Sequence, residues 1–547
     1  MGNFNGIAKR EDEKMIVDNI QFYRPYSNDE AIYHMEIEDG TITSITPGRY
    51  QGNEEDVHDG KGGIVAAGFN DSHMHLLRYG LLKKELDLTE VASWQEMKEA
   101  VQNHYKEMEE YDWIFGKGFD DGSFEDIDKL LTADDLEEIF PDKYMYFMHQ
   151  DGHECVISRK ALELLKEEEG FKKEPDMFKE TDEHGNWNGR FKDTAVHYIK
   201  RHFWGRSVED AKQALKKAFP HISKYGITSL HTDDLNFIGS YEKLWQAYTE
   251  LESEEKLPID VHLHHYIFDK NDLDDFIKEN TRRTGDGTKQ VKVGAIKIFL
   301  DGTQRLHTSA MRNPYPDKPD TDGVLIYSQE QLNSMIKTAA ENNMQVAMHA
   351  IGDRAVEQAV SALEMPEAKT KVLRHRIIHA QCKAPDLIER MKKIKPYIET
   401  QPSFLMEEWM DKDKWTPEDL LPYCDAFNSL IKSHIPITLS SDLPIGTINP
   451  LESIYAAGTR TDLDGNPEGG WMPQEKLSLS DSFHSFTVTP AELEYQEHAK
   501  GKIKEGFQAD FVLLNKNPLK VGDSEIKNIE VEETWYRGRC VFQKQEG

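Results

Sequence analysis

Two histidines that stand two positions apart, His73 and His75, form the clearest chemical motif of this sequence, within the run DSHMH at residues 71–75. Side chains alternate between the two faces of a β-strand, so both imidazoles share one face with the aspartate that opens the run. Two imidazoles at this spacing can bind one metal ion. The motif therefore predicts a metal site at the end of a strand.

Three further residues with metal-binding side chains follow apolar, strand-like runs. His349 stands in MHAIGD, His379 in RIIHAQ and Asp442 in LSSDLP. In a barrel of parallel strands, the carboxyl ends of the strands meet at one mouth, where active sites lie. We therefore expect these side chains to converge on the first histidine pair. A second pair, His262 and His264, lies in mid-strand, which favours packing or pocket lining.

Lys297 is an unusual residue for the interior of the apolar run AIKIFLDG. Burial disfavours the charged form of a lysine, and a neutral amine can capture carbon dioxide as a carbamate. The two oxygens of a carbamate can bridge two cations. The alternative is a structural lysine that pairs with an acid such as Asp301.

The elements that must position these residues follow a β/α pattern. Apolar runs alternate with amphipathic helical segments, which indicates βα units and a parallel sheet. Eight runs are candidate barrel strands: 64–75, 227–231, 261–267, 295–300, 346–349, 377–379, 397–400 and 437–441. The predicted fold class is α/β, a (β/α)8 TIM barrel. A doubly wound open sheet is the alternative, although no GxGxxG motif opens a helix here.

Both ends of the chain read as short strands separated by turns, which suggests one small β-sandwich domain built from both termini. We expect it to comprise residues 1–66 and 486–547, with the barrel over 67–485. The gap after the first barrel strand is too long for one helical crossover. It predicts an inserted subdomain at about 80–205, with strands at 113–119 and 144–150.

Composition excludes several classes of protein. Acidic residues outnumber basic residues by 99 to 66, a formal net charge of −33, and this surface should repel nucleic acid and anionic membranes. No apolar stretch approaches the length of about 18 residues that a membrane span needs, and the N-terminus lacks the apolar core of a signal peptide. We expect a cytoplasmic protein with a small-molecule substrate and, by analogy with other barrels of this size, a homodimer.

The sequence holds four cysteines, and they are far apart along the chain: Cys155, Cys382, Cys424 and Cys540. No two of them form a CxxC pair. Their spacing predicts neither a disulfide framework nor a cysteine zinc site.

Taken together, these motifs resemble the amidohydrolase superfamily, in its family 3 branch that includes N-substituted formamide deformylase-like enzymes. The resemblance spans nearly the whole chain, through DxHxH, GKGFDD, QDGHE, GITSLHTD, KIFLDG, MHAIGD, RIIHAQ, QPSF, SSDLP and GKIKEGFQADFVLL. One departure lies after KIFLDG: the branch tends to have small residues and then Ser-Arg-Thr, whereas Gln304, Arg305, Leu306 and His307 precede Thr308 here. This segment is expected to face the substrate.

The resemblance implies a set of ligands and roles. His73 and His75 would bind one divalent ion and His349 and His379 the other, with zinc as the usual metal. A carbamate on Lys297 would bridge the two ions. Asp442 would be both ligand and proton shuttle. Asp120, His153 and His307 are candidates for substrate contact, although a structural role is equally open for the first two.

The implied reaction is metal-assisted hydrolysis of an amide or formamide-type C–N bond by a metal-activated hydroxide. A mononuclear deaminase of the same superfamily is one alternative, but such enzymes usually carry HxxE at the fifth strand, and here the residues are His349, Ala350, Ile351 and Gly352. A non-catalytic regulatory protein that retains the fold is another. Loss of a ligand would favour it, and none of the expected ligands is missing.

Overall fold

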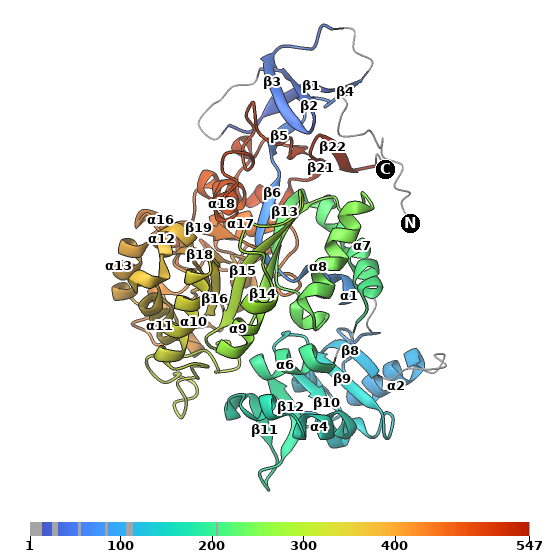
Figure 1. The fold of residues 1–547 in the computed structure, drawn as a ribbon, viewed down its shortest axis with the longest axis vertical. Coiled ribbons are helices and arrows are strands. Elements are labelled where there is room, and N and C mark those ends of the chain that lie inside the picture. Colours follow the sequence, from blue (N-terminus) through green and yellow to red (C-terminus); the bar gives the residue numbers. More distant parts are fainter. Residues whose placement is uncertain are drawn as a thin grey trace. The chain divides into compact units, whose positions relative to one another are not determined.

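The computed structural model describes residues 14–24, 31–52, 56–82, 86–105, 113–203 and 206–545. The chain divides into two compact units (Figure 1). Unit 1 comprises Met1–Leu76, Lys216–Asp233 and Trp245–Gly547, and unit 2 comprises Leu77–Leu215 and Asp234–Leu244.

Unit 1 contains the predicted barrel. Its eight parallel strands are β6 (Phe69–Met74), β13 (Ile227–Thr232), β14 (Asp260–Tyr266), β15 (Val291–Phe299), β16 (Val346–Ala350), β17 (Arg376–His379), β18 (Tyr397–Thr400) and β19 (Ile437–Leu439), and each pairs with the next along the chain. The last strand meets the first just beyond its end, where the Asp442 amide donates to the carbonyl of His73 at 2.8 Å. The prediction of a (β/α)8 barrel is therefore confirmed.

The first barrel strand is shorter than the run 64–75 that we expected, because the chain changes sheets within it. Residues Ile64–Ala67 form β5, which pairs with a C-terminal strand, and the barrel strand begins at Phe69. Gly68 lies at the junction. A Cβ there would stand 2.3 Å from the hydroxyl of Thr228, so only glycine allows this close approach to β13.

Helices follow most barrel strands. In unit 1 and at its boundaries they are α7 (Val208–Lys224), α8 (Tyr241–Ser253), α9 (Lys270–Glu279), α10 (Gln329–Glu341), α11 (Asp353–Leu363), α12 (Thr370–Leu373), α13 (Pro385–Ile394), α14 (Phe404–Glu408), α15 (Lys412–Trp415), α16 (Phe427–Lys432), α17 (Pro450–Thr459) and α18 (Leu479–Leu493). The start of α10 carries the capping box that its sequence indicates: the Ser328 hydroxyl accepts from the Gln331 amide, and the Gln331 side chain accepts from the Ser328 amide. Leu332, Met335 and Ile336 form its buried face.

A second sheet of unit 1 joins both ends of the chain (Figure 1). It contains β1 (Met15–Phe22), β2 (Tyr33–Glu38), β3 (Thr41–Pro47), β4 (Val57–Asp59), β5 (Ile64–Ala67), β20 (Phe511–Leu514), β21 (Val531–Tyr536) and β22 (Arg539–Gln543). The two halves meet where β5 pairs antiparallel with β20. Its core includes Val17, Met35 and Trp535, and the ring of Trp535 stacks on Phe511 at 5.4 Å.

Unit 2 has its own six-stranded sheet, in the order β11-β12-β10-β9-β8-β7. Its strands are β7 (Leu86–Asp87), β8 (Trp113–Phe119), β9 (Tyr144–His149), β10 (Glu154–Ile157), β11 (Lys179–Thr181) and β12 (Trp187–Lys192), and its helices are α1 (Leu76–Leu82), α2 (Trp94–Tyr105), α3 (Ala133–Leu136), α4 (Arg159–Lys166), α5 (Glu169–Lys172) and α6 (Asp193–Phe203). The expected strands at 113–119 and 144–150 coincide with β8 and β9. The expected domain boundaries stay predictions.

A group of buried polar residues lies on β6, β13 and β14 and in the segment that follows α18. We call this group the basal cluster: Asn70, Ser229, His231, Asp260, His262, Glu494 and Lys500. Glu494 is its centre, because its carboxylate accepts from Asn70 at 2.6 Å and from His231 at 2.9 Å and contacts the Lys500 ammonium at 2.6 Å. A (β/α)8 barrel is usually filled by branched apolar side chains. Here a buried ionic cluster is also present on three of the strands.

Within the described part of the chain, no helix combines the length and the apolar character that crossing a membrane requires.

Candidate metal site

Three of the predicted ligands converge at the carboxyl ends of the barrel strands. Single ligand atoms of His73, His379 and Asp442 lie within 4.8 Å of one another, and all three residues are buried. One carboxylate oxygen of Asp442, Oδ1, lies 3.3 Å from Nε2 of His73 and 3.2 Å from Nε2 of His75. The four residues therefore form one cluster of imidazole nitrogens around a carboxylate.

The backbone is unusual at two members of this cluster. His379 ends β17 with a φ angle of 69°, and Asp442, three residues beyond β19, has a φ angle of 51°. Residues other than glycine rarely adopt this left-handed conformation, because it is energetically unfavourable. Where they do adopt it, they often lie at functional sites. The fold thus holds both side chains in positions that an ordinary strand end would not provide.

His349 and Lys297 lie on the two neighbouring strands. The His349 ring stands 4.8 Å from that of His379, centroid to centroid, and stacks on Phe299 at 4.4 Å. Phe299 pairs with His349 across β15 and β16, and Lys297 lies two residues earlier on β15, so it points to the same face. The structure therefore brings together five of the predicted ligands, His73, His75, His349, His379 and Asp442, and places Lys297 on the neighbouring strand, on the face of His349.

The amine of Lys297 is fully buried and has no hydrogen-bond partner among the residues that the structure describes. Burial lowers its pKa, and the charges of Asp233 and Asp442 only partly oppose this effect. A neutral amine is the form that can react with carbon dioxide. A buried amine with a lowered pKa is compatible with carbamate formation, which stays a prediction.

The alternative pairing of Lys297 with Asp301 is wrong. The Asp301 carboxylate accepts backbone hydrogen bonds from Ala310 and Gly352, each at 2.9 Å. It also lies 3.2 Å from Nδ1 of His349. The Asp301 carboxylate therefore lies beside the His349 ring and accepts no hydrogen bond from the Lys297 amine.

Two polar groups outside the cluster fix the rings of His75 and His379. Nδ1 of His75 donates to the Asp233 carbonyl at 2.6 Å, and Nδ1 of His379 donates to Oε1 of Gln401 at 2.7 Å. Such contacts set the tautomer that leaves Nε2 free to bind a metal. The role of Gln401 was missed in the sequence, where its only signal is its position directly after β18.

The donor set suits a divalent transition metal. Imidazole nitrogens and a carboxylate oxygen are ligands that zinc, iron and manganese accept. Burial lowers the pKa of His73 and His379 well below the ordinary value, which favours the neutral ring that metal binding requires. For Asp442, burial alone would raise the pKa, but His73 and His75 lower it well below its usual range and keep the carboxylate ionised. The residues present therefore fit a metal.

The three candidates for substrate contact have partners of their own. His307, in the segment after β15, lies 3.0 Å from the Asp317 carboxylate. In unit 2, Asp120 accepts from Gln150 at 2.6 Å, and Nδ1 of His153 lies 3.2 Å from Asp193. Substrate contact stays a prediction for all three.

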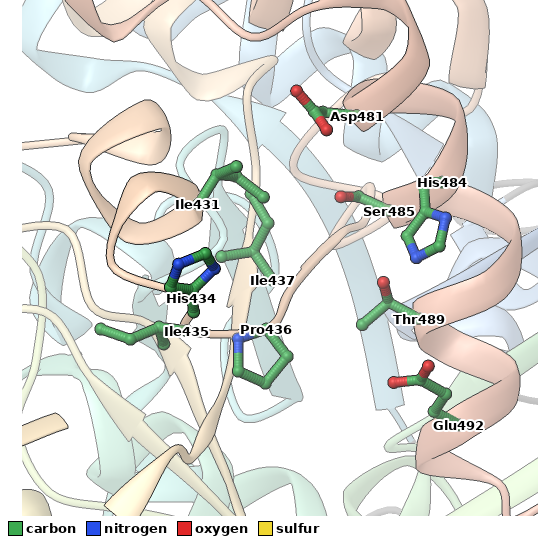
Figure 2. A pocket seen from close by; sticks show the side chains of 10 residues that line it. All are labelled: Ile431, His434, Ile435, Pro436, Ile437, Asp481, His484, Ser485, Thr489 and Glu492. Atoms are coloured by element: carbon green, nitrogen blue, oxygen red, sulfur yellow. The ribbon is translucent and has the colours of Figure 1, made fainter. Parts of the chain in front are cut away.

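A cavity of about 240 Å³ lies between residues 431–437 and α18 (Figure 2). Figure 2 shows Ser485, Thr489 and Glu492 on the face of α18 that lines it. Ile437, which also lines it, is the first residue of β19, whereas Asp442 follows the end of that strand. The cavity is therefore not part of the metal site.

Comparison with solved structures supports the fold. A metal-dependent hydrolase from Pyrococcus horikoshii OT3 superimposes with a TM-score of 0.72 at 24% identity, covering 93% of this chain and 99% of that one. The fold of this chain is thus one that solved structures already show.

The family model described as "Amidohydrolase family" matches residues 56–542, and the chain belongs to this family, within the amidohydrolase superfamily. The predicted resemblance is confirmed. Among curated relatives, the putative amidohydrolase YtcJ of Bacillus subtilis is 28% identical over 523 residues, 94% of this chain and 96% of its own. N-substituted formamide deformylase of Arthrobacter pascens is 21% identical over 517 residues, 90% of each chain.

Proposed function

We propose that this protein is a hydrolase that uses two divalent metal ions to cleave an amide or formamide-type C–N bond of a small molecule. The observation that carries the proposal is the convergence of His73, His379 and Asp442 at the barrel mouth, with their ligand atoms within 4.8 Å of one another. Membership of the amidohydrolase family supports it.

In this proposal each ion has its own pair of histidines. His73 and His75 would hold one ion and His349 and His379 the other. The Lys297 amine, converted to a carbamate, would bridge the two. When bound, the ions lower the pKa of a water molecule and polarise the scissile carbonyl. Zinc is the ion that we expect.

Asp442 would move the proton. Its ionised carboxylate can accept a proton from the attacking water and return it to the departing nitrogen. Amide cleavage needs both transfers, because an amine leaves poorly without protonation. The placement of Oδ1 beside both His73 and His75 supports this role.

The function is tested by metal analysis and a substrate panel on the same purified protein. We expect about two metal equivalents per chain and release of an amine from N-substituted formamides or related amides. Ammonia release from amidine-type rings, with one metal, would instead favour the mononuclear deaminase. Full metal loading without turnover of any amide would contradict the proposal.

Replacing Lys297 with alanine is expected to lower the metal content from about two equivalents per chain towards one and to reduce turnover strongly, because the bridging oxygens are lost. The measurement is metal analysis by mass spectrometry together with the hydrolysis rate. Added acetate should restore part of the activity, because it supplies carboxylate oxygens to the space left by the side chain.

Lys383→Met is the matched control. Lys383 is also fully buried, and burial also lowers its pKa, but its amine donates to the Ala380 carbonyl at 2.9 Å. Its replacement should leave the metal count unchanged. One metal in the native protein, with full activity in Lys297→Ala, would contradict the binuclear proposal.

Gln401→Leu is expected to weaken metal binding about 10–100-fold, because the acceptor that orients the His379 ring is removed. Affinity is measured by competition with a chelator. Gln381→Leu is the control, since Gln381 stands two residues after His379 but donates to Glu408 instead. Equal affinities in the two variants would remove Gln401 from the site.

A further inference from the structure

Two cysteines that are distant in the sequence meet inside unit 1. Cys382 and Cys424, 42 residues apart, have their sulfur atoms 2.9 Å from each other. The two residues also form an isolated antiparallel β-bridge, and both are fully buried. Directly opposed residues of an antiparallel pair have Cα atoms about 4.5–5.5 Å apart, which lies within the range of disulfides.

The pair joins two segments on the face of the barrel that carries the metal site. Cys382 lies three residues after His379, and Cys424 lies in the long connection between β18 and α16. Around them, Met311, Tyr315, Trp415 and Leu420 form a small apolar core.

The segment that carries Cys424 is further held by a buried lysine. The Lys412 ammonium lies 2.8 Å from Glu408 and 3.1 Å from Asp425, the residue that follows Cys424. The Asp425 amide in turn donates to the Gln381 carbonyl at 2.8 Å, beside Cys382. Contacts on both sides of the cysteines therefore keep the two thiols opposed.

We propose that Cys382 and Cys424 are a modification site at which oxidation by a hydroperoxide forms an intrachain disulfide. The peroxide oxidises one thiol to a sulfenic acid and is itself reduced to an alcohol, or to water from hydrogen peroxide. The second sulfur then attacks the sulfenic sulfur, the S–S bond forms, and water leaves. Two thiols and one hydroperoxide thus give one disulfide, one alcohol and one water.

The cross-link would fix the turn after His379 to the connection 401–426. Because both sulfur atoms are buried, the first step needs local opening of this connection, so oxidation is slower than that of an exposed thiol. Once formed, the bond restricts the unfolded chain and should stabilise the protein.

The test is oxidation of the full-length, metal-loaded protein with hydrogen peroxide, followed by denaturation, alkylation of the remaining thiols and digestion without reductant. We expect a peptide pair that links Cys382 to Cys424 and lacks the mass of two hydrogen atoms. Cys155 is the internal control, since it is fully buried like the pair and should be alkylated. Recovery of Cys382 and Cys424 as alkylated thiols, while Cys540 is oxidised, would overturn the proposal.

A second measurement uses the melting temperature. Oxidised native protein should melt at a higher temperature than the reduced form, and dithiothreitol should reverse the difference. In Cys424→Ala the same treatment should give neither the cross-link nor a reversible shift. If that variant does not fold, the peptide analysis of the native protein decides. If the linked peptide pair forms but the melting temperature does not shift reversibly, the proposal that the disulfide stabilises the protein is overturned.

Discussion

Replacing Asp442 with asparagine is expected to lower turnover about 10²–10⁴-fold while the protein keeps its fold and most of its metal. Asparagine has nearly the same size, and the backbone contact of residue 442 with the His73 carbonyl does not involve the side chain. What is lost is the carboxylate that accepts and returns the proton. The other five proposed ligands remain to hold the ions.

Turnover and metal content must be measured on one preparation of Asp442→Asn. Asp386→Asn is the matched control, because Asp386 forms a surface ion pair with Arg312 at 2.9 Å and should be replaceable without effect on turnover. Unchanged turnover in Asp442→Asn would remove Asp442 from the mechanism. Loss of metal in proportion to activity would make it a ligand without a proton-transfer role.

Glu494→Ala is expected to destabilise the protein by about 3–5 kcal/mol, the cost of breaking a buried ion pair. The change leaves Asn70 and His231 without their acceptor and removes one of the two carboxylates that contact Lys500, the other being Asp260. The free energy of unfolding is measured by urea denaturation followed by circular dichroism.

Glu530→Ala provides the comparison. Glu530 pairs with Lys544 at 2.7 Å, but both side chains are exposed to solvent, and such surface pairs contribute little to stability. Equal losses in the two variants would show that the basal cluster contributes no more than a surface contact.

Much of the fold could be predicted from the sequence, because the barrel strands carry strong local patterns. Apolar runs and the capping box at Ser328 are set by neighbouring residues, and the structure reproduces them. The division of the run 64–75 could not be predicted, because it depends on the distant strand β20 and on the approach of Thr228 to Gly68. The local sequence pattern carries no information about such long-range strand pairing.

In the candidate site, too, residues marked by a local pattern could be predicted and residues defined by a distant contact could not. The six proposed ligands were found in the sequence because each follows or lies within an apolar run, where a charged or imidazole side chain stands out. Gln401 and Asp301 were not assigned their roles, since a glutamine or an aspartate after a strand is common and its partner is visible only in three dimensions. The contact of Cys382 with Cys424 could not be predicted either, because the two residues are 42 positions apart in the sequence.

The sheet that joins both ends of the chain also sets an order of events during synthesis. His58 contacts Glu533, 475 residues away, and β5 can pair with β20 only after residues 511–514 have been translated. Until then the ribosome-bound chain exposes an unpaired strand edge, which is prone to aggregation. This sheet can therefore be completed only after translation has passed residue 543, the end of β22, and a messenger truncated before the codons of β20 would leave β5 without this neighbour.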